Sequence, residues 1–166
     1  GCSGIDAVTC ALILHPQETK TLETACGVLS NISVRTELAS AVTDSQKDII
    51  SIIVEAMRTN ASSMCLLEFG TLVLRNIILT NPQSASEASN GISTIINGMK
   101  NHRDALSFNI EACNALWAMA AQSEDCKKKI LDLDGVAILM GALAHNSASD
   151  VQDAARGAID SICWTY

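Results

Sequence analysis

The sequence predicts an all-α fold in which about four helical repeats stack in a row, as in an α-solenoid. The main observation is an eight-residue pattern that occurs four times, with a small residue first and aliphatic residues fifth and eighth. The pattern begins at Ala25, Gly70, Ala112 and Ala155, so its spacing lies within the roughly 40–47 residues of helical repeat proteins. The second observation is composition, since 48% of the residues are hydrophobic and only 3% are aromatic. A core of small and medium side chains suits close packing of helix against helix.

The first repeat, residues 1–34, is expected to lack the short helix that opens the other repeats. Its two helices span residues 4–14 and 19–34, and His15-Pro16 separates them because proline cannot continue a helix. The second repeat, residues 35–79, contains a short, a medium and a long helix. We expect these helices at residues 36–42, 49–57 and 62–79, with a break at Thr43-Asp44-Ser45 between the first two.

The third repeat, residues 80–121, has the same three parts. Its short helix spans residues 82–88, since proline is tolerated in a first helical turn. Asn90-Gly91 forms the break, and a medium helix carrying Ile92 and Met99 follows. The long helix is expected from Ala105 to Ala121.

The fourth repeat, residues 122–166, is expected to contain helices at residues 124–133, 136–144 and 151–163. Asp134-Gly135 separates the first two, because glycine accepts the positive φ found at many helix ends. Ser149 or Asp150 is expected to cap the last helix.

Two segments resemble the armadillo-repeat family. Residues 126–136 are similar to the family's basic-x-x-I-x-x-x-G-apolar entry, and residues 111–120 to its E-A-x-x-A-L-x-N-I-A third helix. The resemblance covers essentially the whole chain and implies one domain, residues 1–166, folded as a right-handed armadillo-type superhelix. HEAT repeats, which have two helices each, are the near alternative. The breaks at Asn90-Gly91 and Asp134-Gly135 favour armadillo.

The ends of the chain do not resemble the polar caps that a free-standing array needs. The first repeat lacks its short helix, and the last helix ends in Ile162-Cys163-Trp164-Thr165-Tyr166. Two interpretations follow. The chain is a fragment of a longer array, which we favour, or its terminal repeats pair in a homo-oligomer.

Charge and hydropathy exclude several classes of partner. The net charge is −7, whereas nucleic-acid binding requires clustered Lys and Arg. Lys127-Lys128-Lys129 is the only basic cluster. An acidic surface permits a partner with basic groups, although it also simply keeps a protein soluble. No apolar run approaches the roughly 18 residues of a transmembrane helix, so we expect no membrane insertion.

The cysteines predict an intracellular protein, in the cytoplasm, the nucleus or both. There are seven, an odd number, without a C-x-x-C pair. Cys26 and Cys113 occupy the second position of the pattern, beside its small first residue, where a small buried hydrophobe fits. Free thiols of this kind are typical of a reducing compartment. No signal-peptide pattern is present.

Neither an enzyme nor a cofactor or metal site is expected. The chain has no phosphate-binding glycine loop, nucleophile elbow or H-E-x-x-H motif. His15, His102 and His145 each end the medium helix of a repeat. Stacked repeats place such residues on the order of 10 Å apart. A zinc site requires that the ligand nitrogens all lie within about 2.1 Å of one zinc ion.

The armadillo resemblance implies a partner-binding groove lined by the long helices, in which Asn side chains hold the backbone of an extended peptide. Asn occupies the seventh pattern position in two of the four copies. Four residues before the third pattern position, three of the four copies have an acidic residue. The predicted groove residues are Asn31, Asn76, Asn114, Glu23, Glu68, Trp117 and Ser161. Other interpretations remain: the Asn residues are simply exposed, Glu23, Glu68 and Asp153 stabilise first helical turns, and Trp117 packs between repeats.

We therefore expect a non-enzymatic scaffold that binds an extended peptide segment. Importin-α-like relatives have a Trp at the third pattern position to hold lysines, but here that position is Gly27, Leu72, Asn114 and Gly157. A lysine-rich import signal is therefore not the expected ligand. The alternatives are a structural or oligomerisation module acting through its end faces, and a regulatory segment of a larger protein.

Overall fold

The computed structural model describes residues 4–34 and 49–164. These residues form helices and connecting turns, with no β-strand among them, so the all-α prediction is confirmed. The expected short helix at residues 36–42 and the break at residues 43–45 lie outside the described residues.

Most expected helices occur within two or three residues of their predicted bounds. The first part of the chain forms α1 (Gly4–Leu14), α2 (Thr19–Ser33), α4 (Ile49–Thr59) and α5 (Met64–Thr80). The remainder forms η1 (Pro82–Ser84), α6 (Ala85–Ala88), η2 (Ser89–Gly91), α7 (Ile92–Asn101), α8 (Leu106–Gln122), α9 (Glu124–Asp132), α10 (Gly135–His145) and α11 (Ser149–Cys163). The single short helix predicted at residues 82–88 is a 3-10 turn followed by one α-helical turn.

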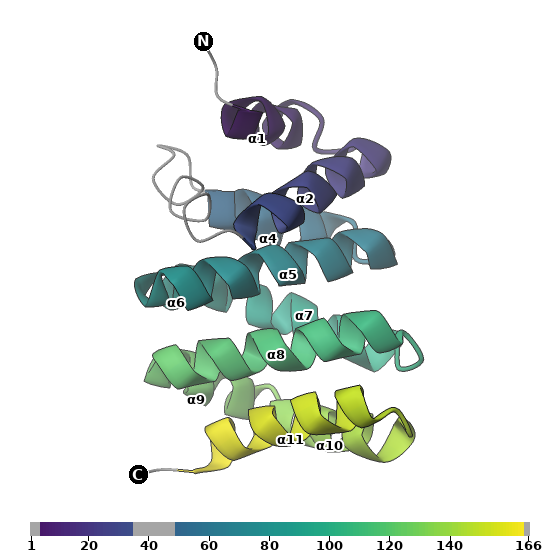
Figure 1. Cartoon of the computed structure of the whole chain (residues 1–166), viewed down its shortest axis with the longest axis vertical. Helices are drawn as coiled ribbons and strands as arrows, with labels where there is room; N and C mark the ends of the chain where they lie inside the picture. Colours follow the sequence, from purple (N-terminus) through teal and green to yellow (C-terminus); the bar gives the residue numbers. More distant parts are fainter. Residues whose placement is uncertain (1–3, 35–48, 165–166) are drawn as a thin grey trace.

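The four long helices α2, α5, α8 and α11 form one layer, in which each packs against the next (Figure 1). We call this the long-helix layer. The medium helices α4, α7 and α10 lie behind it in this view, and α6 and α9 lie near its left edge. Neighbours in this layer are thus consecutive copies of the eight-residue pattern.

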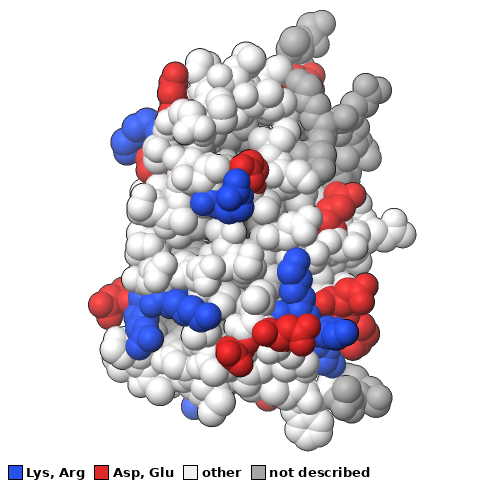
Figure 2. Space-filling view, turned by 180° about the vertical axis from the view of Figure 1, so that it is seen from behind, with Lys and Arg blue, Asp and Glu red and all other residues white. Residues whose placement is uncertain are grey.

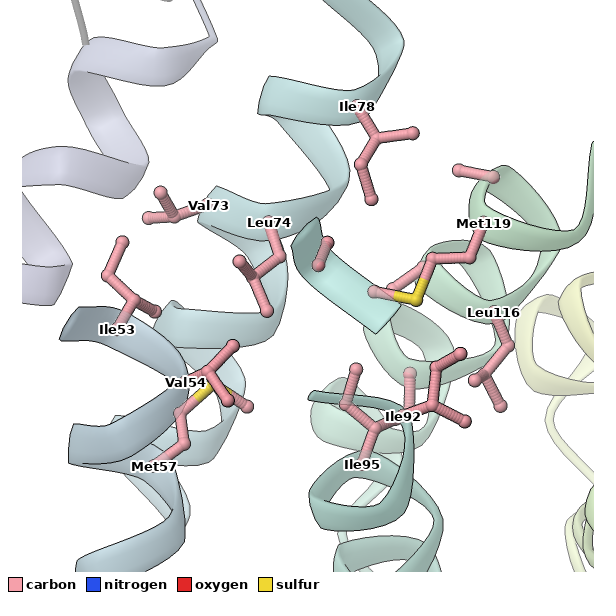
Figure 3. Packing of buried hydrophobic residues seen from close by; sticks show 14 of the residues in the cluster. Ile53, Val54, Met57, Val73, Leu74, Ile78, Ile92, Ile95, Leu116 and Met119 are labelled. Carbon is pink, nitrogen blue, oxygen red and sulfur yellow. The ribbon is translucent and has the colours of Figure 1, made fainter. Parts of the chain in front are cut away.

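The pattern positions build the core. The small first positions are all buried, and so are Leu29, Leu74 and Leu116 at the fifth position, while Ile159 is half-buried. Figure 3 shows how α4, α5, α7 and α8 meet through aliphatic side chains such as Ile53 of α4. The close approach leaves no room for a side chain at Gly70, where a Cβ would lie 2.6 Å from Met57 Sδ.

The break between α9 and α10 differs from the prediction. The positive φ, 56°, belongs to Asp134, and Gly135 has an ordinary negative φ. Glycine is needed at 135 for space, because a Cβ there would lie 2.7 Å from the carbonyl oxygen of Ile130. Gly91 is likewise not left-handed, with φ −81°, and ends the 3-10 turn η2 that leads into α7.

The predicted cap of α11 is also wrong. The helix begins at Ser149, so its N-cap is Ala148, which has no side-chain oxygen to offer. Ser63 and Ser123 are the capping side chains at α5 and α9, where they accept hydrogen bonds from the amides of Leu66 and Cys126. A capping residue is identified by its backbone conformation as well as by its type.

Cys26 and Cys113 are completely buried between helices. Burial raises the pKa of each thiol to about 12, because the apolar surroundings disfavour the thiolate. Both residues therefore serve as small core hydrophobes, as the pattern predicted, and are poor nucleophiles.

Candidate partner-binding face

The open face of the long-helix layer carries most of the predicted groove residues, though in different states. Asn31 is exposed, and its amide donates a 3.0 Å hydrogen bond to the carbonyl of Gly27 in its own helix. Asn114 and Ser161 are half-buried, and Trp117 is 40% exposed. The Asn114 amide forms no hydrogen bond with another described residue, so it remains able to donate and accept at once.

Asn76 does not lie on the open face. It is only 7% exposed, and its Nδ2 donates a 3.1 Å hydrogen bond to Ser33 Oγ of α2. Its Oδ1 accepts from Nη2 of Arg75 at 3.2 Å. Asn76 thus joins α2 to α5. A bound peptide could not reach the Asn76 side chain in this position, although the sequence predicted a contact there.

A row of charged residues crosses from α5 to α8. Arg75 Nη1 lies 2.5 Å from Glu111 Oε2, and each side chain is 21% exposed. Glu68 is half-buried without an ion-pair partner among the described residues. Burial, and secondly the charge of Glu111, raises the pKa of Glu68. Two carboxylates therefore share this part of the face with one guanidinium.

Glu23 links α2 to the start of α5. Its carboxylate accepts hydrogen bonds from Lys20 Nζ at 2.8 Å and from Ser63 Oγ at 2.7 Å, and these bonds lower its pKa. Glu23 and Glu68 are each the fifth residue of their helix, as is Asp153. The interpretation that they stabilise first helical turns is therefore wrong.

A hollow of about 660 Å³ lies between α8, α9 and α11. We call it the tryptophan hollow, because Trp117 and Trp164, which is 68% exposed, are among its walls. Its full lining is Trp117, Ala120, Ala121, Glu124, Lys127, Gly157, Asp160, Ser161 and Trp164. Two of the predicted residues, Trp117 and Ser161, thus meet in one concave place.

The polar groups of the tryptophan hollow are unevenly engaged. The Lys127 ammonium, on a side chain that is 9% exposed, donates a 2.9 Å hydrogen bond to the backbone carbonyl of Trp164 and lies 3.9 Å from Glu124. Asp160 is exposed and has no ion-pair partner among the residues described. The hollow therefore offers indole surface together with an accessible carboxylate.

Sequence reasoning missed Trp164, Glu124, Lys127 and Asp160 as members of one site. The signal was the sixth pattern position, which holds Arg75, Trp117 and Asp160 in successive repeats. All three lie on the long-helix layer, and the last two line the same hollow. The armadillo resemblance points to the seventh position instead, where the family carries Asn.

Residues 4–34 and 49–164 contain no cluster of His, Cys, Asp and Glu that could hold a metal ion. His15, His102 and His145 lie at the ends of α1, α7 and α10, as predicted. None of the described helices is long and apolar enough to cross a bilayer.

No family model and no curated protein matches the chain. Among solved structures, the crystal structure of a protein described as engineered is similar, with a TM-score of 0.76 and 21% sequence identity. The alignment covers 93% of this chain, which spans 62% of the length of that protein. At this identity the likeness concerns the fold alone.

Proposed function

We propose that the protein is a non-enzymatic interaction scaffold, a right-handed α-solenoid of the armadillo type, that binds an extended segment of a partner protein across the long-helix layer. The observation that carries this proposal is the tryptophan hollow, where two exposed Trp residues and the exposed carboxylate of Asp160 line a cavity of about 660 Å³. Exposed Trp in a concave site is typical of interaction hot spots.

The stacking of the repeats supports the solenoid part of the proposal. Consecutive copies of the eight-residue pattern lie on consecutive helices of one layer, each packed against the next, and the small first residue of every copy is buried. Arrays of this kind present extended surfaces for binding.

The chemistry of the face favours a partner segment that carries basic and apolar side chains. Glu68 on α5 and Asp160 on α11 supply carboxylates that have no ion-pair partner among the described residues, and an indole attracts a cation placed over its ring. Asn114, whose amide is unengaged among the described residues, is positioned to hydrogen-bond a peptide backbone. Asn31 and Glu23 extend the same face onto α2.

Peptides selected from a random display library on the wild-type protein provide the test. We expect them to be enriched in Lys or Arg next to apolar residues. A Cβ at Gly157 meets no atom within 4 Å, so Gly157→Leu places an apolar side chain in the hollow and should weaken binding at least roughly tenfold in calorimetry. Trp117→Ala should do the same.

Gly141→Leu is the matched control. Gly141 also lies on a helix and has open space at its Cβ, but it belongs to α10 and does not line the tryptophan hollow. Its affinity for the selected peptides should equal that of the wild type. Peptides that bind Gly157→Leu as tightly as the wild type would remove the tryptophan hollow from the proposal.

A second function, assembly through an end face, is favoured by a separate hollow between α1 and α2. It has a volume of about 460 Å³, and Val8, Ala11 and Val28 are among its apolar lining. Val28 is 39% exposed. Light scattering that gives a dimer mass for the wild type and a monomer mass for Val28→Asp would support this function.

A further inference from the structure

A third hollow lies between the medium helices α7 and α10, with the start of α8 at its base. Its volume is about 90 Å³. The apolar part of its lining consists of Met99, Ala137, Ile138, Gly141 and Ala142, and the polar part of Lys100, Arg103, Asn109, His145 and Asn146. These residues share none with the tryptophan hollow.

The charge at this hollow is opposite to that of the chain. Lys100 and Arg103 are exposed, and neither forms an ion pair with another residue in the described part of the chain. The nearby Asp104 is 95% exposed, and its Oδ1 lies 3.3 Å from His145 Nε2. Two permanent positive charges and one negative charge therefore leave the opening with an excess of one positive charge, in a protein whose net charge is −7.

The other basic residues on the same side provide a comparison. The view from behind shows Lys and Arg in small groups, several of them beside Asp or Glu (Figure 2). Arg58 on α4, for example, lies 2.6 Å from Glu55 and is neutralised by it. Lys100 and Arg103 instead keep their charge at the opening of a concave, partly apolar site.

We infer that this hollow binds the carboxylate of an Asp or Glu side chain from a partner protein. The apolar part of the lining accommodates the methylene groups of such a side chain, while the guanidinium of Arg103 can donate two parallel hydrogen bonds to a carboxylate. The excess of one positive charge matches one carboxylate. A phosphate group carries ≈ −1.5 to −2, for which these groups supply too little compensation.

The probe for this site is N-acetyl-glutamate N-methylamide, titrated into the ¹⁵N-labelled full chain and followed by amide chemical shifts. We expect saturable shifts confined to residues 99–103 and 138–146. The neutral glutamine analogue should cause none of them. Arg103→Gln should weaken the probe's binding roughly tenfold, the factor expected for losing one charge-assisted hydrogen-bonded contact.

A second variant tests the cavity rather than the charge. Gly141→Leu has space for its side chain and should abolish the shifts by filling the hollow. Arg58→Gln, which removes a paired charge, and Gly157→Leu, which fills the tryptophan hollow, should leave the probe's affinity unchanged. Because Gly141→Leu and Gly157→Leu affect different hollows, failure of this inference and failure of the proposed scaffold function are distinguishable.

Three results would overturn the inference. One is that the glutamine analogue binds as well as the glutamate probe. Another is that shifts spread equally over all Lys and Arg residues. The third is that inorganic phosphate binds more tightly than the probe at the same residues, which would assign the site to phosphate groups.

Discussion

Single residues at equivalent repeat positions have different roles in this protein. Asn31 and Asn76 occupy the same seventh pattern position, yet one is exposed and the other is 7% exposed. The difference arises because α5 has α2 against it on one side, so Asn76 meets Ser33, whereas Asn31 has no helix of an earlier repeat beside it in the described chain. A pattern position therefore predicts burial only when the neighbouring helix is known.

We predict that Asn76→Ala lowers the free energy of unfolding by about 1–3 kcal/mol, the cost of removing the hydrogen bonds of a side chain that is 7% exposed. The partners affected are Ser33 and Arg75. Asn31→Ala should change stability by less than ~0.5 kcal/mol, since it is a surface substitution. Urea unfolding followed by circular dichroism measures both. Equal effects of the two substitutions would contradict the roles assigned to them.

Glu68 gives a prediction about pH. Its pKa is raised in the folded state above the ordinary value of 4.5, so the folded state binds its proton more tightly than the unfolded state. Below pH 4.5 the Glu68 carboxyl is protonated in both states, so its raised pKa does not reduce stability. As the pH rises through the folded-state pKa, the folded state loses stability relative to the unfolded state. Glu68→Gln should therefore be more stable than the wild type at neutral pH.

The gain from Glu68→Gln should disappear when urea midpoints are compared below pH 4.5. Glu55→Gln is the control, because the ion pair with Arg58 lowers the pKa of that exposed carboxylate. Its effect should have the opposite sign at neutral pH. A gain for Glu68→Gln that is independent of pH would point to packing rather than to ionisation.

Helices are joined here by polar contacts at their ends as well as by apolar packing. Ser63 caps α5 through the amide of Leu66 and also donates to Glu23 of α2. Ser123 caps α9 through the amide of Cys126, and its side chain forms no hydrogen bond to a helix other than α9 among the described residues. Comparing the two serines therefore distinguishes the stability that a helix cap contributes from the stability that a hydrogen bond between helices contributes.

We predict that Ser63→Ala costs more stability than Ser123→Ala. Loss of the cap alone costs about 0.5–2 kcal/mol in each case, and Ser63→Ala additionally removes a hydrogen bond to a carboxylate. Introducing Glu23→Gln should shrink the difference, because the charged acceptor is then absent. Chemical denaturation tests this with five variants: each serine substitution alone, Glu23→Gln alone, and each serine substitution combined with Glu23→Gln, all compared with the wild type. Equal losses for both serines would show that the contact with Glu23 contributes nothing.

Helices and their order could be predicted from the sequence, and their connections only in part. Apolar periodicity fixed where helices occur, because burial of one face determines it. The left-handed residue at Asp134 was missed, since glycine next to it was the stronger conformational signal and was needed for space instead. The tryptophan hollow was missed because it combines residues from three helices whose mutual approach no local pattern specifies.

On the scale of the whole molecule, burial at the fifth pattern position decreases at the α11 end of the long-helix layer, whereas Leu29 at the α2 end is fully buried. Leu116 of α8 is fully buried between α5 and α11, whereas Ile159 at the equivalent position of α11 is half-buried. We predict that Leu116→Ala lowers the free energy of unfolding by about 2–5 kcal/mol. Ile159→Ala should cost clearly less, as measured by urea unfolding. Equal costs would mean that α11 is covered in solution, as end-face assembly would require.

A polar chain runs across three of the long helices, from Ser33 through Asn76 and Arg75 to Glu111. Apolar side chains tolerate small sliding of one helix along another, but hydrogen bonds between fixed positions do not. These hydrogen bonds therefore fix the spacing between equivalent residues on α2, α5 and α8. Packed helices lie roughly 8–10 Å apart, and an extended peptide advances about 3.3–3.6 Å per residue. An extended segment lying across this face would reach a new helix about every third residue. Every third side chain of the segment would then contact an equivalent position on the next long helix.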